Sequence, residues 1–357
     1  MQHAKITTRH LDGPHIGQIT TTNAHASAGS RDQVIDTMRG IAILMVIGIH
    51  SMPQPLDTGW AVAVDAALRP CVPIFLFASG YLTALSGRAP VGKRLKAALI
   101  PYLIAFAAAY AYMTLHNPAM DHRVTTTLAR LGLAYVFVYY YVFVYIGCTA
   151  VMWLILLISR SSTADSERRL ALLLMLAIGA GLIAGSYLDP TLSRLGFSDS
   201  LIEEVRMRDI PFWFSFMAAG ALTAMFAGFI ERSMRSFFLG GLLAAYMIYA
   251  AVRIFGIGDA AAYDSIAFFG YAVLLCLWLL TVQPRLPRLA AIGSGSYFIY
   301  LWHIFIVMAL RDHVALRQLG PVPGFAIAYG LTVSFSVGAL LILRQVASPR
   351  ALRWLGA

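Results

Sequence analysis

Charged residues are scarce in this chain. Asp, Glu, Lys and Arg make up 12% of the 357 residues, whereas 59% are hydrophobic and the mean hydropathy is +0.72. A soluble domain carries about twice as much charge, so the composition excludes a soluble globular protein. It predicts an all-α chain that crosses a membrane many times.

Cysteine is also rare. Cys71, Cys148 and Cys276 each lie alone within an apolar run, which excludes a disulfide framework and provides no metal-ligand spacing. The sequence contains no P-loop or nucleotide-binding pattern. We therefore expect neither a bound metal nor a permanently bound cofactor.

The first thirty residues have no apolar core, which excludes a secretory signal peptide, and we predict a flexible cytoplasmic tail over 1–33. The formal net charge is +10, but Lys and Arg occur in short clusters between apolar segments. Such clusters set membrane topology, so we expect a membrane partner and no nucleic acid.

Apolar runs bounded by Pro, Gly and charged residues predict about ten transmembrane helices in one membrane domain over 34–347, followed by a short cytoplasmic tail at 348–357. The predicted helices are centred near Val46, Phe75, Ala108, Met152, Leu176, Ala218, Ala245, Val273, Tyr300 and Thr332. With the N-terminus inside, the inner connections hold 14 Lys and Arg against 7 outside. Both termini are therefore expected in the cytoplasm.

The first apolar segment carries two ionisable residues, Arg39 and His50, eleven positions apart. On a helix this spacing puts both side chains on one face, separated by about 16 Å along the axis. Asp36 lies close to the same stripe. Ionisable groups inside a bilayer usually face a wet cavity or the protein interior, so this face is expected to line a functional cleft.

The segment Gly293-Ser294-Gly295-Ser296 is expected to open a later helix, where exposed backbone N–H groups favour an anion. Small residues also serve close helix packing, and that interpretation stays open. Further along, Ser296, Tyr300 and His303 share one helix face, with His303 at a depth similar to that of His50.

Four motifs together resemble the integral-membrane acyltransferase family 3. They are Arg-x10-His at 39–50, Val-Pro-Ile-Phe-Leu-Phe-Ala-Ser-Gly-Tyr-Leu at 72–82, Lys-Arg-Leu-Lys-Ala-Ala-Leu-Ile-Pro-Tyr-Leu at 93–103, and Gly-Ser-Gly-Ser-Tyr-Phe-Ile-Tyr-Leu-Trp-His at 293–303. They occur in the family's order. The sequence is most similar to the branch that O-acetylates sugars, including fucose on nodulation factors and exopolysaccharides.

The resemblance implies transfer of an acetyl group from cytoplasmic acetyl-CoA to a hydroxyl of a glycan or lipid-linked sugar, at the bacterial plasma membrane. His50 is the expected catalytic residue, acting either as a base on the acceptor hydroxyl or as a covalent acyl carrier. His303 would orient His50 or bind the acceptor; a packing histidine is the alternative.

The donor phosphates are expected to bind Arg39, whose planar guanidinium suits them, together with Arg94, Ser294 and Ser296. The expected substrate contacts are Asp36, Arg69 and Tyr300, although Asp36 also has the position to orient Arg39, and Arg69 to pair with Asp65. Arg39 and Asp36 as ordinary membrane-boundary residues remain the alternative.

The third motif departs from the family's Arg-x-x-Arg pattern, because Ala97 follows Arg94 where a second arginine is common. Within the second motif, Ser79-Gly80 predicts close approach of a neighbouring helix. The aromatic run at 135–145 is more typical of a membrane-interface belt than of a sugar-binding surface.

Two other functions remain open. Buried His and Arg also serve proton-coupled transporters and flippases, although the chain lacks the paired broken helices typical of inverted repeats. An O-acyltransferase that uses another acyl group, such as succinyl, is also compatible with the residues, because no sequence feature fixes the size of the acyl pocket.

Overall fold

The computed structural model describes residues 32–357 except 118, 135–137, 160–165 and 258–264, and its compact unit runs from Gln33 to Ala357. The described part consists of helices joined by turns and loops, with no strand. Seven helices in that part are long and apolar enough to cross a membrane, or eight if one bent pair counts as a single span. The protein is thus an all-α polytopic membrane protein, as the sequence predicts.

Each predicted helix centre lies in a helix of the structure. These helices are α1 (Gln33–Ser51), α2 (Gly59–Leu68) with α3 (Cys71–Ser86), α4 (Val91–His116), α6 (Tyr140–Ser159), α7 (Ser166–Arg194), α9 (Ile210–Met225), α10 (Arg235–Ile254), α11 (Ile266–Val282), α12 (Pro287–Ser294) with α13 (Ser296–His313), and α14 (Pro321–Val346). Shorter pieces are α5 (Val124–Gly132), α8 (Asp199–Met207), α15 (Pro349–Leu355) and the 3-10 turns Ala227–Phe229, Arg232–Met234 and Leu316–Leu319.

The prediction of ten spanning helices needs one qualification. The helices α9 and α11 have only 16 and 17 residues, fewer than a straight crossing of about 20 residues requires. Helix α9 packs against α3, α6, α7 and α11, so it lies inside the helical assembly. Its burial accounts for the strong hydropathy that made it resemble a full span.

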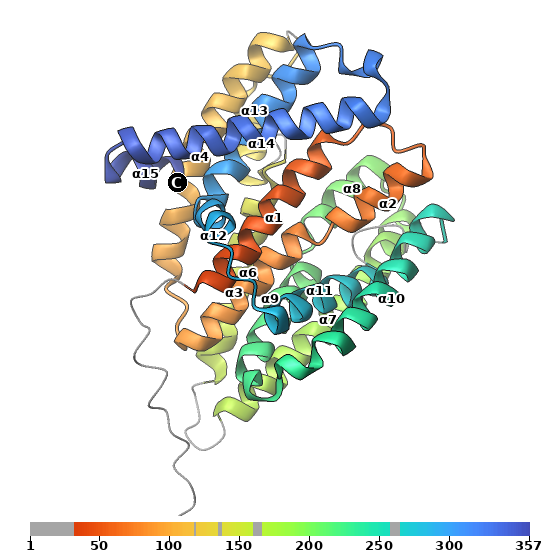
Figure 1. Ribbon diagram of the computed structural model, residues 1–357, viewed down its shortest axis with the longest axis vertical. Coiled ribbons are helices and arrows are strands. Elements are labelled where there is room, and N and C mark those ends of the chain that lie inside the picture. The colour runs from red at the N-terminus through yellow and green to blue at the C-terminus, as the bar shows by residue number, and fades with distance from the viewer. Residues whose placement is uncertain (1–31, 118, 135–137, 160–165, 258–264) are drawn as a thin grey trace, which may run out of the picture. The chain divides into compact units, whose positions relative to one another are not determined.

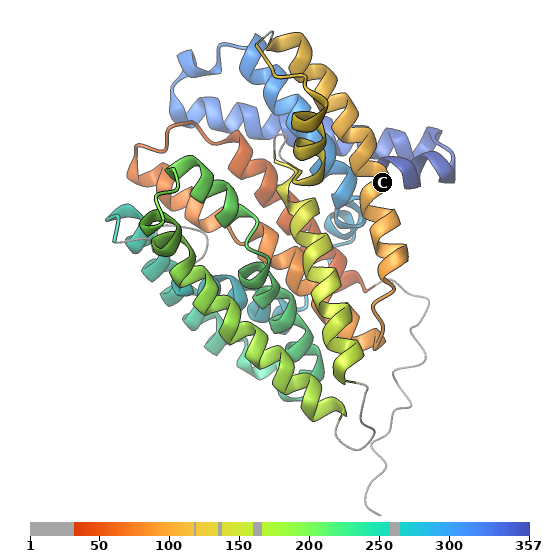
Figure 2. The ribbon, with the colours of Figure 1, turned by 180° about the vertical axis from the view of Figure 1, so that it is seen from behind.

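Helix α1 packs against α3, α12, α13 and α14, and this arrangement surrounds its Arg39 and His50 face with other helices. Its contact with α12 is backbone on backbone. A Cβ added at Gly293 would lie 1.8 Å from the Asp36 carbonyl oxygen, and only glycine fits there. In Figure 1, α1, α12 and α14 lie toward the viewer, whereas α6 and α7 face the viewer in Figure 2.

Helices α3 and α9 also pack backbone against backbone. A Cβ at Gly80 would lie 1.8 Å from the Met217 carbonyl oxygen, and one at Gly220 would lie 2.0 Å from the Phe77 carbonyl oxygen. The close approach predicted from Ser79-Gly80 is confirmed. Because a methyl group at either position meets rigid backbone, this contact fixes the depth of α3 against α9.

The segment 293–296 differs from the prediction. It joins two helices, α12 and α13, which meet at a 78° bend. Ser294 ends α12, Gly295 lies between, and Ser296 begins α13. The sequence predicted a simple helix start because the short α12 has too few residues for a clear periodic signal.

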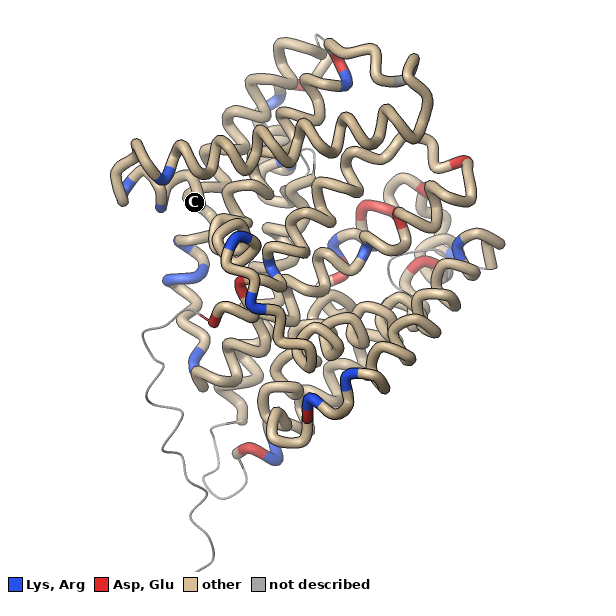
Figure 3. Tube along the Cα trace, viewed as in Figure 1, with Lys and Arg blue, Asp and Glu red and all other residues tan. Residues whose placement is uncertain are grey.

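Figure 3 shows most charged residues at or near helix ends.

Candidate active site

Two histidines from distant parts of the chain meet inside the protein. His50 lies in the last turn of α1 and is half-buried, whereas His303 lies midway along α13 and is fully buried. Nδ1 of His50 is 2.9 Å from Nε2 of His303, within hydrogen-bond distance. The sequence predicted that the two histidines lie at a similar depth, and in the structure they are in direct contact.

Hydrogen bonding determines which nitrogen of each ring carries the proton. Nδ1 of His303 lies 3.0 Å from the Ile299 carbonyl oxygen and 2.9 Å from that of Tyr300. Carbonyl oxygens only accept, so this Nδ1 donates, and in a neutral ring Nε2 is left as an acceptor. Nδ1 of His50 then donates to it. Nε2 of His50 keeps its lone pair, which a base or a nucleophile requires.

His50 lines a small cavity of about 110 Å³, here called the histidine cavity. It is lined by Val46, Ile49, His50, Arg69, Cys71, Val72, Val138, Tyr140, Tyr141, Met207, Trp213 and Tyr300. Among the residues that the structure describes, this lining contains no Asp or Glu. His50 and Arg69 thus border the same space.

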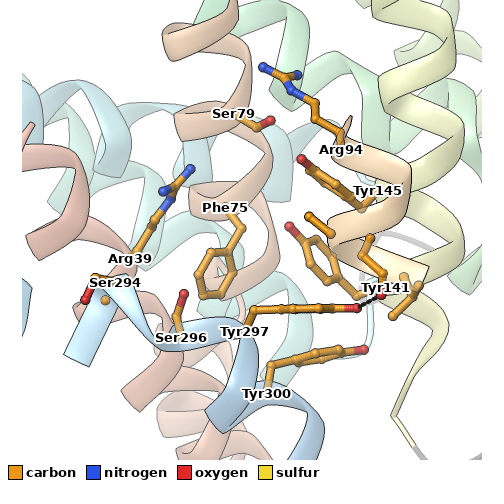
Figure 4. A pocket seen from close by; sticks show the side chains of 14 residues that line it. Arg39, Phe75, Ser79, Arg94, Tyr141, Tyr145, Ser294, Ser296, Tyr297 and Tyr300 are labelled. Carbon is orange, nitrogen blue, oxygen red and sulfur yellow. Dashed lines mark hydrogen bonds between the residues drawn. The ribbon is translucent and has the colours of Figure 1, made fainter. Parts of the chain in front are cut away.

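The larger cavity, of about 250 Å³, is here called the arginine cavity (Figure 4). Its lining residues are Arg39, Phe75, Ser79, Arg94, Ala97, Ala98, Tyr141, Val142, Tyr145, Gly293, Ser294, Ser296, Tyr297 and Tyr300. All four predicted donor-binding residues, Arg39, Arg94, Ser294 and Ser296, lie around this one space.

Arg94 is held in place on one side and open on the other. Its Nη2 donates to Thr83 Oγ1 at 2.7 Å, which fixes the guanidinium between α4 and α3. Its Nη1 is buried and has no hydrogen-bond partner among the described residues. An unsatisfied charged donor in a cavity wall is costly, so an anion in the arginine cavity would stabilise this arrangement.

Arg39 reaches the same cavity from α1, and its guanidinium extends toward the same side as that of Arg94, with Ser79 between them (Figure 4). Arg39 Nη1 lies 3.6 Å from a carboxylate oxygen of Asp36, one turn earlier. Asp36 lines neither cavity. The structure thus places Asp36 where it orients Arg39, and away from the expected substrate contact.

The two serines occupy different walls. Ser296 is buried at the start of α13, whereas Ser294 Oγ accepts a hydrogen bond of 2.9 Å from Nη2 of Arg344 on α14. Nη1 of Arg344 also donates to the Ala291 carbonyl oxygen at 2.8 Å. Arg344 adds a positive charge beside the cavity. Sequence reasoning missed this residue because α14 lies outside the four motifs.

Tyr141 and Tyr300 line both cavities, so the two spaces share this aromatic wall. The ring centroids are 5.4 Å apart in an edge-to-face arrangement. The Tyr300 hydroxyl donates to the Val138 carbonyl oxygen at 2.5 Å. Because this bond occupies the hydroxyl hydrogen, Tyr300 presents chiefly its ring to a ligand.

The interface-belt interpretation of the aromatic run is wrong for the residues that line the arginine cavity. Tyr141 and Tyr145, one turn apart on α6, both do so, and Tyr139 is fully buried with its hydroxyl bonded to the Leu301 carbonyl oxygen. Residues 135–137 of the run lie outside the described residues. The i, i+4 spacing of Tyr141 and Tyr145 was the available signal, but it does not reveal what a helix face contacts.

Arg69 pairs with Asp65 as the sequence predicted, with Nε 2.6 Å from a carboxylate oxygen. The same carboxylate also binds Arg253 of α10. Arg69 nevertheless lines the histidine cavity, so pairing and ligand contact are compatible. Ala97 also lines the arginine cavity, which means that the missing second arginine of the motif would have pointed at this site.

No curated protein and no solved structure matches the chain significantly. The sequence profile of acyltransferase family 3, described as an acyltransferase domain, matches residues 32–341. That range covers most of the chain, including every cavity residue described above. The protein therefore belongs to this family and is a membrane acyltransferase.

Proposed function

We propose that the protein is an O-acetyltransferase that moves an acetyl group from acetyl-CoA to a hydroxyl of a glycan or lipid-linked sugar. It would act in the plasma membrane of a bacterium, with both termini in the cytoplasm, as the positive-inside rule favours. In this orientation the Arg39 end of α1 faces the cytoplasm. The arginine cavity would then receive the donor from inside.

The arrangement of the two cavities carries the proposal. An anion-binding space with Arg39 and Arg94 shares the wall of Tyr141 and Tyr300 with a space that contains His50. A donor whose phosphates bind the arginines and whose flexible arm passes this wall would bring its thioester to His50. The separation of about 16 Å along α1 suits a long, narrow donor.

The histidine pair supports the chemistry. His303 accepts from Nδ1 of His50 and leaves Nε2 as the basic atom, so the pair is prepared to take the proton of a hydroxyl. The hydroxyl oxygen then attacks the thioester carbonyl carbon, and the leaving sulfur recovers the proton. The same lone pair would attack the carbonyl directly if an acyl-histidine forms.

The sugar acceptor rests on the sequence resemblance and on the aromatic lining of the histidine cavity. Tyr140 and Trp213 offer ring surfaces beside His50, and rings of this kind stack on the apolar faces of sugars. Fucose of a nodulation factor or exopolysaccharide is the specific acceptor that the branch resemblance suggests. The small cavity favours acetyl over larger acyl groups.

The experiment compares membranes that contain the wild-type protein, His50→Ala or His116→Ala. His116 is an exposed histidine at the end of α4 that lines neither cavity, and it is the matched control. Each membrane is incubated with radiolabelled acetyl-CoA, and the lipid-linked and polysaccharide fractions are extracted.

We expect label in a glycan fraction with the wild type and His116→Ala, and none with His50→Ala at equal protein level. Full transfer by His50→Ala would overturn the catalytic role. If wild-type membranes transfer no label to any fraction or added glycan, the donor is tested once more as succinyl-CoA. A negative result there favours a transporter.

A further inference from the structure

The four tyrosines that line the arginine cavity differ in what their hydroxyl groups bind. The hydroxyls of Tyr297 and Tyr300 each donate to a backbone carbonyl oxygen, at 2.6 and 2.5 Å. Within the described part of the chain, the hydroxyls of Tyr141 and Tyr145 have no hydrogen-bond partner. A tyrosine hydroxyl in a protein interior usually finds such a partner, so these two are available to a ligand.

The available hydroxyls can be reached and are held in place. Tyr141 and Tyr145 are both partly exposed, and both line the arginine cavity. Three aromatic rings surround that of Tyr141. Its centroid lies 5.9 Å from that of Phe75, 6.0 Å from that of Tyr145 and 5.4 Å from that of Tyr300. A side chain that is already fixed by packing loses little conformational entropy when a ligand binds to it.

The two hydroxyls follow one another between the two cavities. Tyr145 lines the arginine cavity alone, whereas Tyr141 lines both the arginine cavity and the histidine cavity. At a spacing of i, i+4 on α6 they share one helix face and are displaced by about 6 Å along its axis. In Figure 4, Tyr145 lies between Arg94 and Tyr141. A ligand that extends from Arg94 to the histidine cavity therefore passes Tyr145 first and Tyr141 second.

The chemistry of the hydroxyl groups indicates what they bind. A tyrosine hydroxyl is neutral and both donates and accepts, which suits a neutral polar group such as an amide, whereas the planar guanidinium of Arg94 suits an anion. In acetyl-CoA, the pantetheine arm joins the phosphates to the thioester. This arm carries two amide groups in a row, separated by two methylene groups. Two successive hydroxyls beside an arginine match two successive amides beside a phosphate.

We propose that Tyr145 and Tyr141 bind the two amide groups of the pantetheine arm. Tyr145 binds the amide nearer the phosphates, and Tyr141 binds the amide nearer the thioester. This inference rests on the proposed function and assigns two specificity-determining residues to its donor. The pair makes the site select a thioester with a full pantetheine arm over a shorter one, because a short donor leaves the hydroxyls without a partner.

The test uses three donors that share the acetyl thioester. Acetyl-CoA has the phosphates and both amides, S-acetylpantetheine has both amides without the phosphates, and S-acetyl-N-acetylcysteamine has only the amide beside the thioester. Each radiolabelled donor is assayed with purified protein in proteoliposomes, with the extracted membrane glycan and lipid fraction as acceptor. For a donor that the wild type does not use, the inhibition constant against acetyl-CoA replaces the KM.

The variants are Tyr141→Phe, Tyr145→Phe and a matched control, Tyr329→Phe. Each substitution removes one hydroxyl and keeps the ring. Tyr329 is also partly exposed, but it belongs to α14 and lines neither cavity. Thermal unfolding of each variant separates loss of fold from loss of binding, and if Tyr141→Phe does not fold, Tyr145→Phe decides.

We expect Tyr145→Phe to raise the KM about 3- to 10-fold for acetyl-CoA and S-acetylpantetheine, and to leave that for S-acetyl-N-acetylcysteamine unchanged. Tyr141→Phe should raise the KM for all three donors by a similar factor. The kcat should stay within about threefold of the wild type, because these hydrogen bonds are present in both the ground state and the transition state. Tyr329→Phe should change neither constant.

Four results would overturn the inference while the wild type remains active. They are an unchanged KM for acetyl-CoA in both cavity variants, an equal rise in Tyr329→Phe, a rise confined to acetyl-CoA, and a fall in kcat without a change in KM. The third would assign the hydroxyls to phosphate, and the fourth would assign them to the chemical step. Absence of transfer by the wild type from every donor would refute the proposed function itself.

Discussion

Replacement of His303 tests whether the histidine pair acts through its proton arrangement. In His303→Met, Nδ1 of His50 loses the acceptor that lies 2.9 Å away, and the ring is free to carry its proton on Nε2 instead. One buried hydrogen bond contributes about 1 kcal/mol, and about 1.4 kcal/mol corresponds to a tenfold change in population. Together with the lost ring orientation, this predicts a fall in kcat of about 10- to 100-fold.

The matched variant is His303→Gln, whose amide oxygen offers an acceptor in a side chain of similar reach. Both variants are assayed for kcat and both KM values in proteoliposomes, after thermal unfolding shows that they are folded. We expect His303→Gln to lose less kcat than His303→Met, with the donor KM unchanged in both. A kcat for His303→Met within about threefold of the wild type would refute the reasoning, because the proton arrangement would then be unimportant.

Three further predictions concern the donor site, the helix contacts and a buried carboxyl. Arg94→Gln should raise the KM for acetyl-CoA about tenfold with a smaller effect on kcat. The control is Lys96→Gln, which removes the same charge from the same helix; Lys96 lines neither cavity, so this KM should not change. Equal effects of the two substitutions would contradict the phosphate role of Arg94. Gly80→Ala should destabilise the protein by about 1–3 kcal/mol in thermal unfolding, since its methyl group meets the Met217 carbonyl, whereas Gly92→Ala, with open space around it, should not lower stability. Burial, aided by the nearby charge of Asp189, raises the pKa of Asp209 to about 6. Between the ordinary pKa of an aspartate and this value, the carboxyl binds a proton in the folded protein but is ionised in the unfolded chain. Its contribution to the free energy of unfolding should therefore fall as the pH rises from 4 to 6. Asp209→Asn should remove this contribution to the pH dependence of the melting temperature between pH 4 and 6. An unchanged pH dependence in Asp209→Asn would argue against the raised pKa.

The sequence predicted the helices well because the signal for a membrane helix is local. A run of apolar residues must satisfy its own backbone hydrogen bonds in lipid, so its length and composition largely specify the helix. The prediction was weaker where burial in protein replaced burial in lipid. The 16 residues of α9 are as apolar as a spanning helix, because α3, α6, α7 and α11 cover them.

The candidate site was only partly predictable. Periodicity placed Arg39 and His50 on one face of α1, and Ser296 and His303 on one face of α13. It carried no information on which face of α6 turns inward. The tyrosines of α6, including Tyr141, were therefore assigned to the membrane interface until the structure placed them in a cavity wall.

What the sequence by itself determined is the class of protein and the chemistry available to it. Scarce charge specifies a membrane protein, and the few ionisable residues left in apolar helices mark the site because keeping them there is costly. The relations between these residues depend on the tertiary structure. The bond between His50 and His303 joins residues 253 positions apart, and Asp65 binds Arg253 from a distant helix. Such pairs depend on how the helices pack, and a periodic pattern within one helix does not contain that information.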